Sequence, residues 1–194
     1  MKILSETIIA QAKTIHSISD REVQIIVDAV KHFKPNSFLD FGCHLGHLSI
    51  RLAIDFEMDI YAVDNFIGSN NDTKMKNTIH QITNGNGNFY YNLMKNIEEA
   101  EVYLSLNGNI QVYYSDKFFK LPDLKIDFAF IDSSHDSYEE FIDIDKLIPP
   151  GGILAGHDNT DRYERNQGVL KGIAMIEDNY EWIRNDFLFI MQKL

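Results

Sequence analysis

The stretch from residue 37 to residue 46, Ser-Phe-Leu-Asp-Phe-Gly-Cys-His-Leu-Gly, decides the fold of this chain. It opens with a short apolar run that contains Asp40, and it ends in a turn between Gly42 and Gly46. Residues 47–55 then place apolar side chains at helical spacing, which predicts a helix directly after the turn. The stretch therefore predicts a buried strand, a glycine turn, and a helix whose first amides face the end of the strand.

A glycine turn at the end of a buried strand is typical of a binding site. Glycine tolerates positive φ and has no side chain that would keep a ligand away from the backbone. Two glycines also form tight turns in α/β proteins that bind nothing there, so the glycines alone leave both interpretations open. Asp40 favours binding, because a carboxylate at this position suits a cationic amino group better than a phosphate.

Composition limits the class of protein. The 194 residues, 44% of them hydrophobic, fit one domain over residues 1–194 with a sizeable core. A net charge of -11 without clustered Lys and Arg argues against nucleic acid as a partner. The single cysteine, Cys43, excludes an internal disulfide. Without a signal-peptide pattern or an apolar run of membrane length, we expect a cytoplasmic protein that acts on small molecules.

The rest of the chain alternates between apolar strands and amphipathic helices, as in a parallel α/β sheet. Residues 66–88 differ, because they are rich in Gly and Asn and have little periodicity, so we expect them to form a lid over a substrate. Ser19 and Glu22 have the spacing of a capping box. The expected helices cover residues 3–15, 20–33, 47–55, 89–104 and 166–178, with a further helix after residue 138 that runs through residues 141, 144 and 145. The expected strands cover 38–41, 59–64, 110–114, 126–132, 153–156, 182–184 and 187–191.

Acidic residues stand where several of these strands end. Asp64 lies 22 residues beyond Gly42, where an open α/β nucleotide site places a carboxylate for two ribose hydroxyls. The strand ending at Tyr114 is followed by Ser115 and Asp116. An acid at a strand end also serves as a helix cap or turn former, and spacing alone does not decide between the two roles.

Two neighbouring strand ends carry acids together with histidines. Asp132 is followed three positions later by His135, and the next strand runs into His157, Asp158 and Asn159. Adjacent parallel strands lie about 4.8 Å apart, so these groups can converge on one ion or one hydroxyl. Their oxygens suit Mg²⁺, and an imidazole is a competent base at neutral pH. Histidines at such places also cap helices, but two such clusters favour a catalytic site.

Two parts of the sequence resemble a known family. The first turn resembles motif I of the class I S-adenosyl-L-methionine (SAM) methyltransferases, acidic-x-Gly-x-x-x-Gly, with His44 where many members have a further glycine. The runs Phe-Ile-Asp-Ser-Ser-His-Asp-Ser-Tyr at 130–138 and Pro-Gly-Gly-Ile-Leu-Ala-Gly-His-Asp at 150–158 resemble the signature of methyltransferase family 24. That family is similar to metal-dependent O-methyltransferases such as the catechol, caffeoyl-CoA and macrolide-sugar enzymes.

The resemblance implies a fold and an activity. The fold is a single Rossmann-like α/β domain with a seven-stranded, mostly parallel sheet, helices on both faces, and an antiparallel strand from a C-terminal hairpin that turns at Asn185 and Asp186. The activity is SAM-dependent methylation of a hydroxyl on a sugar, natural product or phenol, assisted by Mg²⁺ or another divalent cation.

The resemblance also implies roles for individual residues. His135 is expected to act as general base and Asp132 as a second catalytic residue. Asp132 and Asp158 are expected to bind the metal, with His157 or Asn159 as a third ligand. The residues expected to bind the cofactor are Asp40, Gly42, Cys43, His44, Gly46, Asp64, Asn65, Ser115, Asp116 and Asp132.

Other functions are compatible with parts of this pattern. A nicotinamide-dependent oxidoreductase would use a similar turn, but its Gly-x-Gly-x-x-Gly pattern is not supplied by His44 and Leu45. A non-catalytic SAM-binding module would keep the turn without using His135. Methyl transfer without a metal is a further variant. The two N-terminal helices, within residues 1–34, are candidates for a homodimer face.

Overall fold

The structure is a computed structural model that describes residues 18–66, 88–121, 124–133, 138–160 and 167–194. The helix expected over residues 3–15, nearly all of the expected lid, and His135 lie outside these residues. The helices are α2 (Asp20–Phe33), α3 (His47–Asp55), α5 (Phe89–Leu104), α6 (Ser115–Phe118), α7 (Glu139–Leu147) and α8 (Gln167–Ile176), followed by a 3-10 turn, η2 (Glu177–Asn179). The strands are β1 (Ser37–Phe41), β2 (Asp59–Asp64), β3 (Asn109–Tyr114), β4 (Phe128–Ile131), β5 (Ile153–Gly156), β6 (Tyr180–Arg184) and β7 (Phe189–Lys193).

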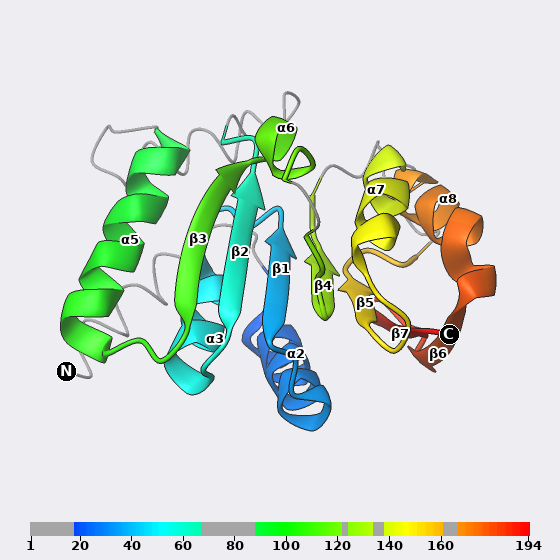
Figure 1. The fold of residues 1–194 in the computed structure, drawn as a ribbon, viewed down its shortest axis with the longest axis horizontal. Coiled ribbons are helices and arrows are strands. Elements are labelled where there is room, and N and C mark those ends of the chain that lie inside the picture. Colours follow the sequence, from blue (N-terminus) through cyan, green and yellow to red (C-terminus); the bar gives the residue numbers. More distant parts are fainter. Residues whose placement is uncertain (1–17, 67–87, 122–123, 134–137, 161–166) are drawn as a thin grey trace.

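The seven strands form one sheet in the order β3-β2-β1-β4-β5-β7-β6 (Figure 1). Neighbours from β3 to β5 are parallel, whereas β7 is antiparallel to both β5 and β6. The chain order reverses between β1 and β4, so the strand ends that carry the predicted site meet at this switch point. The predicted Rossmann-like sheet with its antiparallel C-terminal strand is confirmed.

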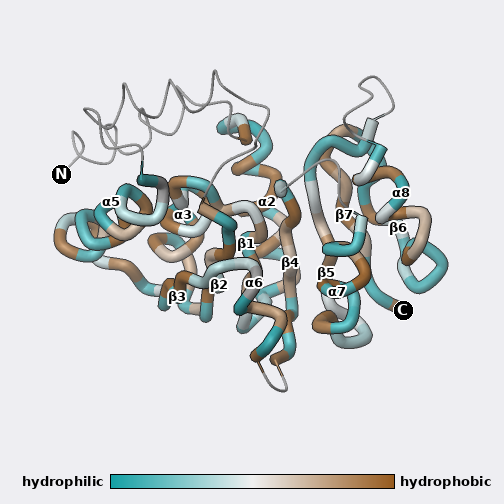
Figure 2. The backbone as a smooth tube through the Cα atoms, turned by 90° about the horizontal axis from the view of Figure 1, so that it is seen from above, coloured by the Kyte–Doolittle hydropathy of each residue, from teal (hydrophilic) through white to brown (hydrophobic). Residues whose placement is uncertain are grey.

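Helices cover both faces of the sheet, as predicted. Alternate residues of β1 and β4 point to opposite faces, so Phe38 and Phe128 stack at 5.1 Å on the face covered by α2 and α3. Leu39 and Ala129 point to the other face, against α7 and α8. In Figure 2, α2 and α3 lie on one side of the central strands and α7 lies on the other. This packing fixes the strand ends from which the site is built.

Short sequence patterns correctly predicted where most of the described helices and strands begin and end. Ser19 and Glu22 form the predicted capping box at the start of α2. The predicted two-residue hairpin at Asn185 and Asp186 is wrong, because β6 and β7 are separated by residues 185–188. Asp186 accepts hydrogen bonds from the Arg184 side chain at 2.6 and 2.9 Å and from the Leu188 amide at 3.1 Å, and these bonds hold the longer connection.

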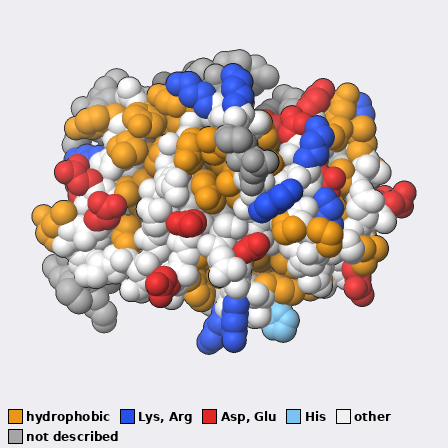
Figure 3. All heavy atoms as spheres, in the orientation of Figure 1, with side chains coloured by type: hydrophobic (Ala, Val, Ile, Leu, Met, Phe, Trp, Pro, Cys, Tyr) orange, Lys and Arg blue, Asp and Glu red, His pale blue; other side chains and the backbone are white. Residues whose placement is uncertain are grey.

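The described surface carries mixed charges. On the face in Figure 3, acidic and basic side chains are distributed among apolar and neutral ones rather than gathered in a stripe. Within the described part of the chain, no helix is both long enough and apolar enough to cross a bilayer.

Candidate active site and metal centre

The β1–α3 turn depends on backbone conformations that favour glycine. Gly42 has φ +94° and Gly46 has φ +80°, and both lie where an L side chain is strained. A Cβ on Gly42 would stand 2.2 Å from the carbonyl oxygen of Asp132, so this turn presses directly against the end of β4. His44, also predicted to bind the cofactor, has φ 51°. This left-handed conformation explains why the motif often has glycine there.

Asp40 lies inside the protein at the end of β1. It is 2% exposed and accepts a hydrogen bond of 2.6 Å from the hydroxyl of Ser49 on α3. Burial, reinforced by the negative charges of Asp132 and Asp64, raises the pKa of Asp40 to about 7. Asp40 therefore interacts electrostatically with Asp64 and Asp132, the acids predicted at the ends of β2 and β4.

Asp64 closes β2 and is held by the backbone around it. Its two carboxylate oxygens accept hydrogen bonds from the amide of His44, at 2.9 Å, and from the amide of Phe66, at 2.8 Å. One residue of the glycine turn thus orients the acid expected to bind ribose. Asn65 follows as an exposed residue. Cys43 is buried, and its amide donates to the carbonyl oxygen of Val63, as the Gly42 amide also does.

An aromatic cluster that the sequence interpretation missed lies beside this acid. The Tyr114 ring, at the end of β3, contacts Phe66 edge-on with centroids 5.0 Å apart and stacks on Tyr90 at 5.4 Å. The only sequence signal was aromatic residues directly at strand and helix ends. Ser115 is the first residue of α6, which begins directly where β3 ends, and its role in binding the cofactor stays a prediction. The side chain of Asp116 lies outside the described part of the structure.

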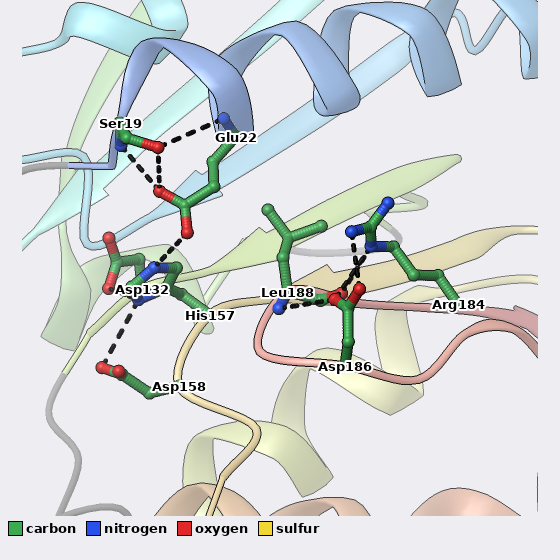
Figure 4. Close-up of polar contacts among 8 residues, drawn as sticks. All are labelled: Ser19, Glu22, Asp132, His157, Asp158, Arg184, Asp186 and Leu188. Carbon is green, nitrogen blue, oxygen red and sulfur yellow. Dashed lines mark hydrogen bonds and ion pairs between the residues drawn. The ribbon is translucent and has the colours of Figure 1, made fainter.

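Asp132, the acid predicted at the end of β4, lies close to His157 and Asp158, which were predicted after β5, whereas His135 of the β4 group lies outside the described residues. One ligand atom from each of Asp132, His157 and Asp158 lies within 4.8 Å of the others (Figure 4). Nδ1 of His157 is 3.5 Å from Asp158 Oδ2 and 3.9 Å from Asp132 Oδ1. Asp158 is 3% exposed and has φ 63°, a strained conformation of the kind concentrated at functional sites.

Asn159, also predicted as a metal ligand, bonds to the connection between β6 and β7. Its side-chain nitrogen donates to the side-chain oxygen of Asn185 at 2.9 Å, in the β6–β7 connection. Its backbone amide donates to the carbonyl oxygen of Phe187. In this structure Asn159 therefore links β5 to the hairpin, and its role as a ligand stays a prediction.

His157 is held from several sides. Its Nε2 lies 2.9 Å from Glu22 Oε1, and its ring meets the Phe187 ring edge-on at 4.4 Å. Burial alone would lower the pKa of His157, but the hydrogen bond with Asp158 and the charges of Asp132, Asp158 and Glu22 raise it to about 9. An imidazolium therefore balances these carboxylates when no other cation does.

Glu22 is the site residue that the sequence interpretation missed. Helix α2 was predicted to pack on the sheet, which it does through Val23, Ile26 and Val27. Burial alone would raise the pKa of the Glu22 carboxyl, but hydrogen bonds from Ser19 and the charge of His157 lower it. The capping box was the only signal, and it indicates nothing about a partner 135 positions away.

Comparisons with known proteins identify the fold. No protein-family model matches the chain, and no curated protein matches it. Three solved structures resemble it along nearly its whole length. They are an O-methyltransferase from Bacillus cereus in complex with S-adenosylhomocysteine (16% identity, 100% of this chain and 91% of that one, TM-score 0.62), the O-methyltransferase TomG from Streptomyces achromogenes in complex with SAM (15%, 97% and 89%, 0.63), and the Podospora anserina methyltransferase PaMTH1 bound to S-adenosylhomocysteine (11%, 100% and 88%, 0.63).

Proposed function

We propose that this chain, whose fold is that of the class I SAM-dependent methyltransferases, is a methyltransferase that transfers the methyl group of SAM to a hydroxyl of a small molecule. The observation that carries the proposal is the set of interacting carboxylates Asp40, Asp64 and Asp132 around the glycine turn. SAM carries a sulfonium and an ammonium group, so this negatively charged edge favours it. The neighbours with bound SAM or S-adenosylhomocysteine support the same reading.

The same carboxylates argue against a dinucleotide. The pyrophosphate of NAD is anionic and binds where a glycine turn presents amides without a competing negative charge. In this turn the amides of Gly42 and Cys43 donate to Val63, and the amide of His44 donates to Asp64. Three amides of this turn are therefore already bonded within the protein, and the buried carboxylate of Asp40 lies on the strand that leads into the turn.

The residues present also fit a divalent cation. Asp132, Asp158 and Nδ1 of His157 offer oxygen and nitrogen ligands on one edge of the sheet. A cation bound there would lower the pKa of an acceptor hydroxyl and help to fix its oxygen. Transfer then forms a bond between that oxygen and the methyl carbon while the sulfur–carbon bond breaks, and we assign the released hydroxyl proton to His135.

The protein contributes mainly by holding groups in position. The glycine turn, fixed against β4, keeps the cofactor site and the acid and histidine group within one edge of the sheet. Alignment of this kind converts a reaction between two molecules into one within a complex. The acceptor is proposed only as a small hydroxylated molecule such as a sugar, natural product or phenol.

Isothermal calorimetry tests the cofactor. We expect the protein to bind SAM and S-adenosylhomocysteine but not NAD. Exchanging Asp64 for Asn should weaken SAM binding about 10- to 100-fold, because one or two charge-assisted hydrogen bonds are lost.

Asp59→Asn is the matched control for this experiment. Asp59 starts the same strand at its opposite end and bonds the exposed side chain of Asn109 at 3.1 Å, so the affinity for SAM should not change. Binding of NAD in place of SAM would reject the proposed function. An equal loss in both variants would instead indicate that the change acts through the stability of β2.

A further inference from the structure

We propose that Glu22 is a positioning residue for a metal ligand: its carboxylate fixes the ring of His157 so that Nδ1 joins Asp132 and Asp158 in binding a first-row transition-metal dication in preference to Mg²⁺. The inference deepens the metal part of the proposed function and rests on it. It assigns a role to α2 that extends beyond packing on the sheet.

The positions of the two ring nitrogens carry the first step. Nε2 of His157 is 2.9 Å from Glu22 Oε1, and an ionised carboxylate can only accept a hydrogen bond. Nε2 must therefore carry the proton of that bond. Nδ1 faces Asp158 at 3.5 Å and Asp132 at 3.9 Å on the other side of the ring. When a cation replaces the proton on Nδ1, the ring that donates to Glu22 presents its Nδ1 lone pair to the ion held by the two acids, an arrangement typical of histidine ligands that are oriented by an outer carboxylate.

Contacts around Glu22 and His157 hold the imidazole ring in this orientation. Glu22 is fixed by Ser19, whose amide and hydroxyl donate to Glu22 Oε2 at 2.8 and 2.5 Å. The backbone amide of His157 donates to the carbonyl oxygen of Ile131 at the end of β4. The edge of Phe187 meets the ring. A side chain held in this way loses little freedom when it binds an ion, and an ion does not have to reorient it.

The donor set decides which ion fits. Mg²⁺ prefers oxygen ligands in near-octahedral geometry, whereas imidazole nitrogen suits ions such as Fe²⁺, Ni²⁺ and Zn²⁺. Mn²⁺ also suits oxygen ligands, but it is softer than Mg²⁺ and accepts an imidazole nitrogen more readily. One imidazole among carboxylates therefore shifts the preference away from Mg²⁺. Asn159, the remaining predicted oxygen ligand on β5, donates its side-chain nitrogen to Asn185 in this structure. Nδ1 of His157, by contrast, lies within 4 Å of a carboxylate oxygen of each acid.

Calorimetric titration of the full chain with Mn²⁺ and with Mg²⁺, in the absence of SAM, tests the inference. We expect Mn²⁺ to bind more tightly than Mg²⁺. Exchanging Glu22 for Gln should lower the Mn²⁺ affinity about 10- to 100-fold, because the ring loses its charged anchor. Gln at this position also completes a capping box, so helix α2 is kept. Asp28→Asn, an exposed change on the same helix, should leave the affinity unchanged.

A spectroscopic measurement on the Mn²⁺-loaded protein tests the ligand directly. Electron spin-echo modulation from a directly bound imidazole nitrogen should appear in the unaltered protein and disappear in His157→Gln. Equal affinities for the two ions, an unchanged Mn²⁺ affinity in Glu22→Gln, or a missing nitrogen signal would each overturn the inference. Because these readouts need neither cofactor nor acceptor, failure here with intact SAM binding leaves the proposed methyltransferase standing. Failure of SAM binding rejects that function instead.

Discussion

Alanine in place of Gly42 is expected to lower the free energy of unfolding by roughly 2–5 kcal/mol and to abolish SAM binding. Two costs add in this estimate. The left-handed conformation at φ +94° costs an L residue about 1–2 kcal/mol. The new Cβ would also stand 2.2 Å from the backbone oxygen of Asp132, and forcing an extra carbon into a packed site typically costs about 1–3 kcal/mol. Relief of the clash would move the turn away from β4.

Gly151→Ala is a matched control for that measurement. Gly151 has φ +83°, but outside its chain neighbours no described atom lies within 4 Å of the position its Cβ would take. This variant should therefore lose only the conformational part, about 1–2 kcal/mol, and should keep SAM binding. Urea unfolding of both variants separates the two costs. Equal losses would mean that contact between the turn and β4 does not limit this site.

Exchanging Asp40 for Asn is expected to stabilise the protein at pH 8 and to weaken SAM binding. The pKa of Asp40 is raised to about 7 in the folded protein, against about 3.9 in an unfolded chain. The folded state therefore holds a proton more tightly, so wild-type stability declines as the pH rises from about 4 to 7. Asn has no such charge, and at pH 8 it should gain up to about 4 kcal/mol.

Urea unfolding at pH 4, 6 and 8 checks this sign. The difference between Asp40→Asn and the unaltered protein should be smallest at pH 4, grow through pH 6, and level off near pH 8. Asn can still accept the hydrogen bond from Ser49, so lost bonding contributes little. A stability difference that stays constant with pH would show that ionisation of Asp40 does not destabilise the folded protein. Weaker SAM binding in the same variant would show that the buried carboxylate of Asp40 serves cofactor binding at the expense of stability.

The fold could be predicted because the patterns that indicate its helices and strands lie within short stretches of sequence. The ends of α2, α3, β2 and α5 follow from apolar periodicity and, for α2, from the capping box that begins at Ser19. The mostly parallel sheet with its antiparallel C-terminal strand follows from the resemblance, and the alternation of apolar runs with amphipathic helices predicts the helical links between its parallel strands. The length of the C-terminal hairpin was mispredicted, because the side chain of Asp186 bonds within the turn and extends it.

The candidate site was predictable only in part. Residues at strand ends could be assigned to one edge of the sheet, which is why Asp132 and Asp158 were identified. Contacts between residues far apart in sequence could not be predicted, because no periodicity connects Glu22 to His157. The hydrogen bond of Ser49 to Asp40 was missed for a similar reason, since serine within a helix has no pattern that marks it as a donor to a strand.

The pairing of β1 with β4 has a consequence for how the protein opens. Residues 37–114 supply β1 to β3, residues 128–193 supply β4 to β7, and this pair joins the two sets. A ligand held by Asp64 on one side and by Asp132 on the other bridges the junction, so separating the two halves would require its release. Hydrogen exchange of the amides of residues 128–132 should therefore slow on ligand binding by more than that of the amides in β6. A ligand bound in this way would hold the two halves of the sheet together.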